Sequence, residues 1–490
     1  MKPLKTLAFF LLVGAFLLPA VLLFPEEGIE MGPFKLQMMT LDDIFAKDTV
    51  QYADISDLIQ NGFDEDSLPD ITEMLPPAAD SVEIPLEEDT VRADAAALAA
   101  SVYRLEFPNG DKSILNTFFK SLDQLAAGKK ELVRILHYGD SQIEGDRISS
   151  YIRNKLQTKY GGTGPGLLPA LQPYESYFSI TQTNEGDWRR YAVFGRKNPE
   201  VEHKSYGALA AFSRFAPIVP DSLFKDSVLY TAAVNFSESK VAYSRVRTFQ
   251  KVQIFYGNAK RPVEVSLWVD EVEVYRDSLK ADVDYARFSY VLPQATKNLS
   301  IKFSGYDSPD IYAISLESLS GISLTNIGMR GSSGTVFNKM EYGHLNRMYA
   351  DLNVKLFILQ FGGNVMPYIK DSSEAISYGR WFYSQLRSLK KMRPDASFVV
   401  IGPSDMSYKV KDKYLTYPFL PLVRDELRKA TLKAGFAYWD MFEAMGGYNS
   451  MPSWVNADPA LAGSDYTHFT PRGAKLIANM FYNALMIEKK

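Results

Sequence analysis

A serine, a histidine and an aspartate have the types and spacing needed for nucleophilic catalysis. Ser141 completes the tripeptide Gly139-Asp140-Ser141, which directly follows the apolar run LVRILHY at 132–138. Near the other end of the chain, Asp465 precedes His468 by three residues, a spacing that lets the carboxylate fold back onto the imidazole. A hydroxyl nucleophile, an imidazole base and an orienting carboxylate are the groups that acyl transfer through a serine intermediate requires.

Two glycine-containing motifs lie between these residues and could supply donors to an oxyanion. Gly362-Gly363-Asn364 follows the apolar run at 356–361, and the paired glycines allow a tight turn that presents the amide of Asn364. The stretch NIGMRG ends at Gly331, whose backbone N–H can donate to an anion. Taken singly, each motif also has a structural interpretation: a helix cap at Ser141, a turn at Gly362-Gly363-Asn364, a cap or surface residue at the histidine. Together, at the ends of successive strands, they favour a catalytic site.

The composition excludes several other chemistries. The 490 residues include no cysteine, which rules out thiolate zinc sites, iron–sulfur clusters, disulfides and a cysteine nucleophile. No two of the four histidines are four residues apart, so we expect no metal site, and we expect no cofactor. With 54 basic and 58 acidic residues the net charge is −4, which argues against nucleic acid as a partner. Because one hydrophobic core usually serves no more than about 250–300 residues, we expect more than one folded unit.

The elements that position the site are predicted to be strands of a parallel sheet. Short apolar runs at 132–138, 356–361, 397–402 and 435–439 are each followed by a turn and a helical pattern. Such continuous apolar strands are typical of a parallel sheet covered by helices on both faces. The last helix has a clear start, with Thr470 as N-cap and Pro471 at the first helical position.

The middle of the chain has a different period. From 173 to 319 the sequence alternates apolar and polar residues in short runs such as KVQIFYG, VEVSLWVD and LSIKFSG. Runs of this kind, with turn signals about every ten residues, predict an antiparallel β-sandwich. We therefore expect a β-module inserted into an α/β domain that comprises residues 100–172 and 320–490.

The N-terminal region predicts a membrane attachment. Lys2 and Lys5 precede an uncharged apolar run at 7–24, and no small-residue cleavage pattern follows it, so we expect residues 1–30 to be an uncleaved anchor. A buried core helix is the alternative, and cleavage would instead give a secreted protein. The positive-inside tendency places the rest of the chain on the periplasmic or extracellular side. Residues 31–99 include an acidic, Pro-containing stretch at 64–94, which predicts a solvated tether.

In this order, the four motifs resemble the SGNH (GDSL) family of esterases and acyltransferases across the whole α/β part. The resemblance implies a flavodoxin-like, three-layer α/β/α domain with Ser141 as nucleophile, His468 as base and Asp465 as its orienting acid. It also implies an oxyanion hole built from the backbone N–H groups of Ser141 and Gly331 and the side chain of Asn364. Asp140 and Gly363 have supporting roles in this scheme.

Finer features are similar to the bacterial peptidoglycan O-acetylesterases of this family. These features are GDSQIEGD in place of GDSL, the glycine-rich stretch at 160–169, and a β-module between the serine and glycine motifs. In those enzymes the insert resembles a carbohydrate-binding module. One departure is Val365, which follows Asn364 where the family usually has Asp. That change affects the hydrogen bonds that support the amide and not the amide itself.

The sequence therefore predicts a serine esterase that removes O-acetyl groups from an envelope or extracellular polysaccharide. An O-acetyltransferase that uses the same three residues with a membrane acetyl donor is the first alternative, since a sugar hydroxyl can replace water in the second step. A glycan-binding envelope protein without activity is the second. The expected partners are an acetylated glycan and, through the N-terminal segment, a membrane.

Overall fold

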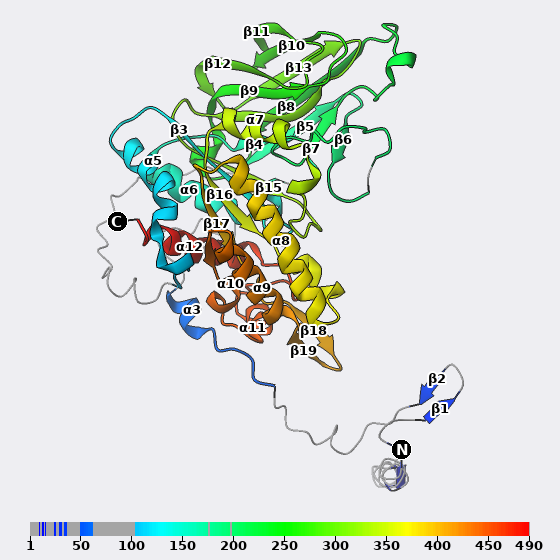
Figure 1. The fold of residues 1–490 in the computed structure, drawn as a ribbon, viewed down its shortest axis with the longest axis vertical. Helices are drawn as coiled ribbons and strands as arrows, with labels where there is room; N and C mark the ends of the chain where they lie inside the picture. The colour runs from blue at the N-terminus through cyan, green and yellow to red at the C-terminus, as the bar shows by residue number, and fades with distance from the viewer. Residues whose placement is uncertain are drawn as a thin grey trace. The chain divides into compact units, whose positions relative to one another are not determined.

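The computed structural model describes residues 50–61, 103–174, 177–196 and 198–489, together with residues 9, 12–13, 15, 24–25, 29–31 and 34–36. Met1–Tyr52 and Ala53–Lys490 form two separate units (Figure 1). In the first unit, β1 (Ile29–Met31) and β2 (Phe34–Leu36) pair as an antiparallel hairpin. Most of the predicted anchor and the acidic stretch at 64–94 lie outside the described residues. Within the described ranges, no helix is long and apolar enough to cross a membrane.

A five-stranded parallel sheet forms the centre of the α/β part. Its spatial order is β15 (Gly321–Gly328), β3 (Leu132–Gly139), β16 (Val354–Gln360), β17 (Ser397–Ile401) and β20 (Ala437–Trp439). Every neighbouring pair in this sheet is parallel. Numbered along the chain, the strands lie in the order 2-1-3-4-5, which is the order of flavodoxin-like doubly wound sheets.

Helices cover both faces of this sheet and bury two separate cores. Alternate residues of β3 point to opposite faces, so that Val133 and Ile135 join one core while Leu136 and Tyr138 join the other. The first core is closed by α5 (Asn116–Ala126), α6 (Ser149–Tyr160) and α12 (Pro471–Met486), and the second by α7 (Tyr342–Leu352), α8 (Ser372–Met392) and α9 (Leu420–Lys433). Two short helices, α10 (Met441–Ala444) and α11 (Ser450–Asn456), precede the loop to α12. Thr470 caps α12 as expected, since its Oγ1 accepts the Gly473 N–H at 3.2 Å.

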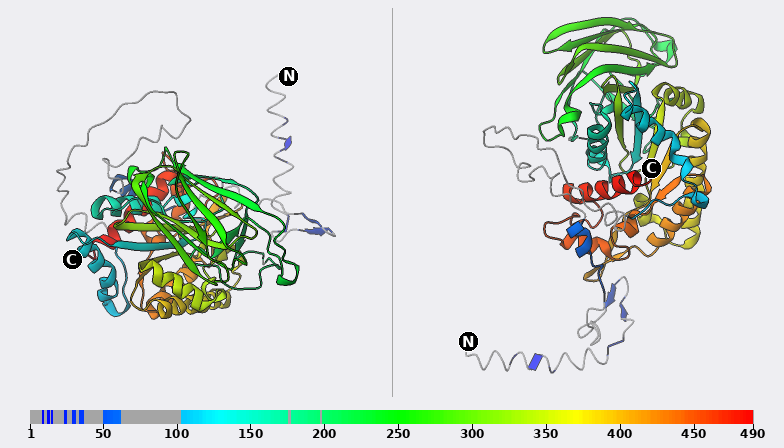
Figure 2. Two further views of the ribbon diagram at one scale, coloured as in Figure 1. Left: turned by 90° about the horizontal axis from the view of Figure 1, so that it is seen from above. Right: turned by 90° about the vertical axis from the view of Figure 1, so that its left-hand side faces the viewer.

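In the sequence, the two parts of the α/β fold are separated by a β-module of two antiparallel sheets. One sheet has the order β11 (Val272–Leu279), β10 (Val263–Val269), β13 (Leu299–Gly305), β8 (Tyr230–Glu238) and β5 (Ile180–Glu185). The other has the order β12 (Ala286–Thr296), β9 (Phe249–Gly257), β14 (Asp310–Glu317), β7 (Ala211–Arg214) and β6 (Arg189–Ala192). Apolar residues from both sheets share one core, and Figure 2 shows the module in green at one end of the α/β part. The prediction of a mixed α/β protein with antiparallel sheets is therefore confirmed.

The glycine-rich stretch after α6 joins the module to the parallel sheet. It leads into β4 (Gly166–Leu168), which pairs antiparallel with β14 of the module. Gly162 and Gly164 have positive φ angles of 106° and 85°, and a Cβ at either position would overlap the backbone of β15 or β14. Glycine is therefore required here for a close backbone approach.

A buried ion pair reinforces the same junction. Arg134 of β3 donates from Nε and from a terminal guanidinium nitrogen to the Glu317 carboxylate of β14, at 2.9 and 2.7 Å. Ser323 of β15 donates a further hydrogen bond to Glu317 at 2.6 Å. Both charges are buried, so removal of either partner would leave an uncompensated charge in the interior.

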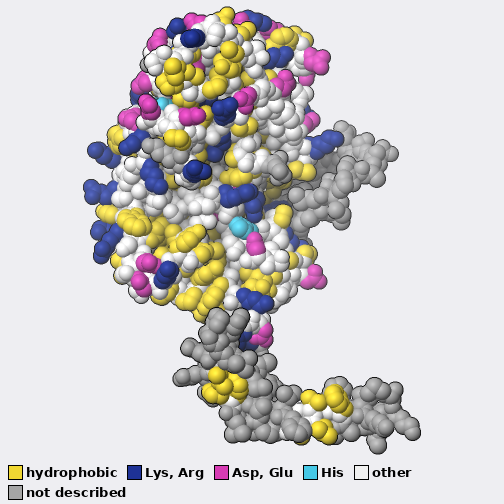
Figure 3. All heavy atoms as spheres, turned by 90° about the vertical axis from the view of Figure 1, so that its right-hand side faces the viewer, with side chains coloured by type: hydrophobic (Ala, Val, Ile, Leu, Met, Phe, Trp, Pro, Cys, Tyr) yellow, Lys and Arg dark blue, Asp and Glu magenta, His cyan; other side chains and the backbone are white. Residues whose placement is uncertain are grey.

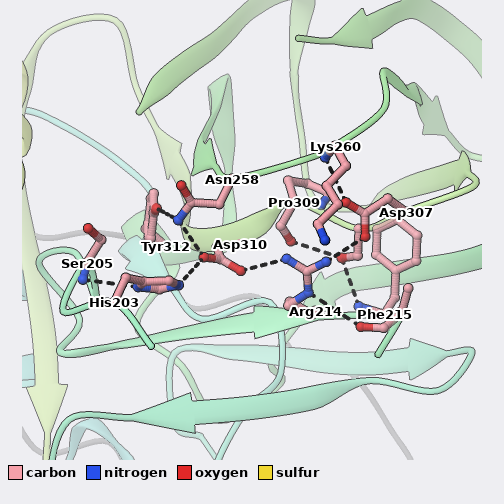
Figure 4. Close-up of polar contacts among 12 residues, drawn as sticks. His203, Ser205, Arg214, Phe215, Asn258, Lys260, Asp307, Pro309, Asp310 and Tyr312 are labelled. Atoms are coloured by element: carbon pink, nitrogen blue, oxygen red, sulfur yellow. Dashed lines mark hydrogen bonds and ion pairs between the residues drawn. The ribbon is translucent and has the colours of Figure 1, made fainter. Parts of the chain in front are cut away.

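The module also contains a partly buried polar cluster on β7, β14 and the adjoining loops (Figure 4). Arg214 donates to Asp307 at 2.6 Å and to Asp310 at 2.9 Å. The Asp310 carboxylate also lies 2.9 Å from His203 Nε2. Because the Ser205 N–H donates to Nδ1 of His203 at 3.2 Å, the ring proton belongs on Nε2. Every charge in the cluster has a partner, which identifies it as a structural network.

A short segment within the stretch expected to be a tether docks on the α/β part. The Ala53 N–H donates to the Asn449 carbonyl at 3.3 Å, and Ser453 Oγ donates to the Ala53 carbonyl at 2.6 Å. Ile55, next to α3 (Ser56–Asn61), is buried in the core that contains α12. Figures 1 and 2 show this segment in blue beside the orange helices α10 and α11.

Candidate active site

Three of the predicted motifs follow three adjacent parallel strands. Ser141 comes after β3, Gly331 after β15 and Asn364 after β16. Gly139 at the end of β3 is level with Gly328 on one side and Gln360 on the other. The chain continues from β3 to β15 on one side of the sheet and then to β16 on the other side, so the strand order reverses at β3. Open α/β sheets place their ligand sites at the carboxyl edge of such a reversal.

The serine, histidine and aspartate form a continuous hydrogen-bonded chain. Ser141 Oγ lies 2.8 Å from His468 Nε2, and His468 Nδ1 lies 2.7 Å from the Asp465 Oδ2. Since a carboxylate only accepts, Nδ1 carries the ring proton, which leaves Nε2 as the acceptor of the serine hydroxyl proton. This is the arrangement that a histidine needs to act as a general base on serine.

The loop that carries the histidine is ordered by the aspartate itself. Asp465 Oδ1 accepts the backbone N–H groups of Thr467 and His468, both at 3.0 Å. Burial acts to raise the pKa of the Asp465 carboxyl, but hydrogen bonds from His468 and Thr467 outweigh it and hold the pKa below its usual value. Tyr466 has a φ angle of 55° and stacks on Tyr414 with ring centroids 3.5 Å apart. The carboxylate therefore stays ionised, as the orienting partner of an imidazole must.

A small cavity is lined by Ser141, His468 and three further predicted residues, Asp140, Gly363 and Asn364. It has a volume of about 70 Å³ and lies against the serine and the histidine. Its walls are Asp140, Ser141, Gln142, Gln360, Phe361, Gly363, Asn364, Gly402, Pro403, Ser404, Met406, Met441, Thr467 and His468. The predicted supporting residues thus line the same cavity as the nucleophile.

Asn364 and Gly331 follow the two strands that neighbour β3 in the sheet. Asn364 Nδ2 donates one hydrogen bond to the Ser332 carbonyl at 3.1 Å, and the same amide also donates to the Asp140 carboxylate. Gly331 is outside the set of cavity-lining residues, has a φ angle of 79°, and has open space beside its Cα. The bond from Asn364 to Ser332 nevertheless holds the two predicted donor segments next to each other.

Asp140 is a buried carboxyl beneath the site. Burial raises its pKa to about 6, while hydrogen bonds from the Gln142 backbone and the Asn364 side chain and the charge of His468 oppose the rise. The Gln142 N–H donates to Asp140 Oδ1 at 2.9 Å. Asp140 thus supports the amide of Asn364 from within the protein, where the usual Asp after that asparagine is replaced by Val365.

Sequence reasoning missed Gln142 and Ser404. Gln142 is buried, and its Nε2 donates to the Thr467 carbonyl at 2.6 Å and to Ser404 Oγ at 3.3 Å. A usable signal was present, because Pro403-Ser404 follows the predicted strand at 397–402 and so falls on the same sheet edge as the other motifs.

The other histidines do not share this geometry. His137 is fully buried between Ser149 and Gln360, and burial lowers its pKa to about 3 against the opposing effect of the hydrogen bond that His137 Nε2 donates to Gln360 Oε1. His344 is buried as well, which lowers its pKa to about 4. Among the described residues, no group of three His, Asp or Glu side chains could hold a metal ion.

Comparison with known proteins defines the fold. No family model matches the sequence, and no curated protein matches it. A peptidoglycan O-acetylesterase structure aligns with 78% of this chain and 98% of its own, at 20% identity and a TM-score of 0.59. A family two carbohydrate esterase from Clostridium thermocellum covers 62% of this chain and 98% of its own, at 8% identity and TM-score 0.24. A GDSL-like lipase from Parabacteroides merdae covers 34% and 73%, at 16% identity and TM-score 0.25.

Of these three structures, the first aligns well enough to define the architecture. The chain has an SGNH/GDSL hydrolase-like fold. Its sequence similarity to the aligned structure is too low to transfer a substrate, so the activity has to be argued from the site.

Proposed function

We propose that the protein is a serine esterase that removes O-acetyl groups from a glycan through an acyl-serine intermediate. The observation that carries this proposal is the unbroken hydrogen-bonded chain from Ser141 through His468 to Asp465 at the carboxyl edge of the sheet. A set of side chains in this order has the geometry of nucleophile, base and orienting acid.

In the first step, Ser141 Oγ attacks the ester carbonyl carbon while His468 Nε2 takes the hydroxyl proton. The developing oxyanion accepts hydrogen bonds from the backbone N–H groups of Ser141 and Gly331 and from the Asn364 amide, and loss of one such donor costs about 2.7–4 kcal/mol. When the tetrahedral intermediate collapses, the C–O bond to the sugar breaks and His468 returns its proton to the departing hydroxyl. Acetyl-serine remains on the enzyme.

Water completes the reaction. His468 Nε2 takes a proton from the water as its oxygen attacks the acetyl carbon, and the same donors stabilise the second oxyanion. Collapse releases acetate and restores the Ser141 hydroxyl with the proton that His468 held. If a sugar hydroxyl took the place of water, the same residues would act as a transferase.

The shape of the cavity supports a short acyl group. Its volume is about 70 Å³, and Pro403, Met406 and Met441 form apolar parts of its wall. A small cavity beside the nucleophile supports a short acyl group such as acetyl. The fold shared with a peptidoglycan O-acetylesterase adds support for an acetylated glycan as substrate.

We further propose that the apolar run at 7–24 holds the protein at a membrane, with the α/β part on the periplasmic or extracellular side. The charge pattern of the sequence supports this location. Protease treatment of intact and of permeabilised cells tests it: degradation of the catalytic part only after permeabilisation of the inner membrane would contradict it.

The test of the activity uses the full-length protein in detergent. We expect acetate release from an aryl acetate and from an acetylated glycan, and covalent labelling of Ser141 by a fluorophosphonate. The Ser141→Ala variant should lose both signals, whereas Ser384→Ala, on the exposed side of α8, should keep them. Absence of labelling and of acetate release from a folded wild-type protein would favour a glycan-binding protein. Greater transfer than hydrolysis in the presence of an oligosaccharide acceptor would favour the transferase.

A further inference from the structure

Three arginines surround the loop that carries Gly331. Arg330 directly precedes this glycine, and Arg147 follows the short 3₁₀ turn after Ser141. Arg190, on β6 of the module, interacts electrostatically with Tyr174, whose hydroxyl contacts Gly328 and Arg330. Arg147 lies within electrostatic range of Asp465 and Asp140, which places it beside the catalytic residues. Figure 3 shows a band of Lys and Arg side chains across the middle of one face of the molecule. We call Arg147, Arg190 and Arg330 the basic rim.

The arginines of the basic rim differ in whether they make a direct ion pair with a carboxylate. Glu144 is bound by the guanidinium of Arg330 through two hydrogen bonds, one of 2.6 Å from Nε, so this carboxylate is already occupied. Arg147 Nε donates to the Glu144 backbone carbonyl at 3.1 Å, which carries no charge. Two of the three guanidinium groups therefore have no carboxylate partner among the described residues.

Arg190 is the least compensated of the three. Its side chain is half-buried, and its Nε is fully buried without a hydrogen-bond partner among the described residues. Burial lowers the pKa of this guanidinium, and Tyr174 is the titratable neighbour that acts against the shift. A half-buried cation without an anion is costly to maintain, so a structure that keeps one is suited to bind an anion there.

Tyr174 fixes the position of the basic rim relative to the catalytic loop. Its hydroxyl donates to the Gly328 carbonyl at 2.9 Å and accepts a hydrogen bond from the backbone N–H of Arg330 at 3.2 Å. The Arg330 guanidinium lies 5.1 Å from the centre of the Tyr174 ring. The glycine at 328 in turn packs on Glu144, since a Cβ there would lie 3.2 Å from the Glu144 Cα. The rim is therefore built on ordered contacts with β15.

We propose that the basic rim is a subsite for a carboxylate carried by the acetylated glycan, and that Arg190 is the main residue that binds this carboxylate. This proposal rests on the proposed esterase function and names the substrate class as an acidic glycan. The planar guanidinium suits bidentate binding of a carboxylate, and three arginines beside the oxyanion loop would orient the ester over Ser141. Such a carboxylate belongs either to a uronic acid ring or to an acidic side arm attached to a neutral sugar.

The experiment compares full-length wild type with Arg190→Gln, and with Arg189→Gln as matched control. Arg189 is the adjacent residue of β6, faces the opposite side of the strand and pairs with Asp187 on the surface, so the control has the same change of charge. The probes are two acetylated oligosaccharides, one with a uronic acid and one with an acidic side arm. Each is assayed beside its own primary carboxamide, which is neutral.

We expect wild type to hydrolyse at least one carboxylate probe with a kcat/KM at least tenfold above that of its carboxamide. Arg190→Gln should lose this preference mainly through a higher KM, and Arg189→Gln should keep it. A preference confined to one probe supports the subsite and identifies the source of the carboxylate. Equal turnover of carboxylate and carboxamide by wild type, or a preference that survives in Arg190→Gln, overturns it.

An aryl acetate, which has no carboxylate, separates the two proposals. If wild type and Arg190→Gln hydrolyse it equally, the catalytic residues are intact and the glycan data judge the subsite alone. If no ester is hydrolysed, the proposed function fails. The dissociation constants of the deacetylated probes then decide whether the carboxylate subsite exists. A tenfold tighter binding of a carboxylate than of its carboxamide, lost in Arg190→Gln, still supports the subsite, and equal binding overturns it.

Discussion

Gln142 Nε2 donates a 2.6 Å hydrogen bond to the backbone carbonyl of Thr467, which joins the residue after the nucleophile to the residue before the base. The two positions are 325 residues apart in the sequence. Because a carbonyl oxygen only accepts, the nitrogen of the Gln142 amide must face it, and this orientation is not open to an amide flip. The distance between Ser141 Oγ and His468 Nε2 therefore depends on a side chain that takes no part in the chemistry.

Replacement of Gln142 should weaken catalysis more than folding. We expect Gln142→Ala to lower kcat by about tenfold to a hundredfold with little change in KM, since misplacement of a catalytic group by about 1 Å can cost a factor of this size. Gln182→Ala is the matched control, because Gln182 of β5 also donates to two backbone carbonyls, those of Pro169 and Ala170, but does not line the cavity. Steady-state kinetics on an aryl acetate measures both variants. An unchanged kcat in Gln142→Ala would show that the loop keeps its position without this bond.

Asp465 orients His468, so Asp465→Asn should reduce kcat without unfolding the protein. An amide nitrogen opposite Nδ1 favours the other tautomer, and this change in a related arrangement costs about 10⁴ in kcat. We expect a loss on the order of 10²–10⁴, because the Asp465 side chain is 53% exposed and water can partly replace it. Fluorophosphonate labelling should slow in parallel. Equal kcat in the two proteins would exclude an orienting role.

Asn364 is expected to stabilise the oxyanion by turning one of its two N–H groups, which in this structure donate to Ser332 and Asp140, toward the developing charge. Removal of one such donor in Asn364→Ala should lower kcat by about 10²–10³ with little change in KM. Asn364→Asp should be at least as slow, because its carboxylate would repel the oxyanion. The comparison of kcat and KM decides: a change confined to KM would place Asn364 in substrate binding.

The buried carboxyl of Asp140 should contribute to the pH profile. Its pKa of about 6 lies above the usual value, so it is ionised at neutral pH and becomes neutral as the pH falls through about 6. Its negative charge favours the imidazolium that forms on His468 during acylation, and this contribution is present above about pH 6 and lost below it. We expect Asp140→Asn to have lower kcat/KM at neutral pH and a shallower acid limb between about pH 5 and 7.

The raised pKa of Asp140 favours activity at higher pH but favours the folded state at lower pH. The folded pKa lies above the unfolded value of 3.8, so the folded state binds more protons between these two values. This group therefore makes the free energy of unfolding fall as the pH rises from about 4 to about 6. Denaturant unfolding of wild type and Asp140→Asn across this range measures the difference, and identical slopes would contradict the assignment.

The glycine-rich junction gives a prediction about folding. Gly164→Ala should lower the free energy of unfolding by about 2–4 kcal/mol, since it combines a positive φ with overlap onto the backbone of β14. Gly161→Ala is the control for backbone conformation: Gly161 has φ 76° and ψ 178° but no atom within 4 Å of the added Cβ, so about 1–3 kcal/mol is expected from conformation alone. Denaturant midpoints compare the two variants, and equal losses would show that backbone conformation alone requires glycine here.

The sequence predicted the parts of the molecule that local patterns determine. Apolar runs and the turns after them located the strands that end near Ser141 and Asn364, and the spacing of Asp465 and His468 anticipated their hydrogen bond. Contacts that depend on long-range pairing could not be read in the same way. The bond from Gln142 to Thr467 and the approach of Arg190 to Tyr174 exist only after β6 and the last loop meet the parallel sheet.

The pairing of β4 with β14 has a consequence for the independence of the inserted module. Excision of residues 173–319 would leave β4 without its only antiparallel partner among the described strands, and would strip Arg134 of the Glu317 carboxylate. The glycines that fit against β14 would then border an exposed apolar surface. The insert is therefore not structurally independent, and its deletion would also destabilise the α/β part.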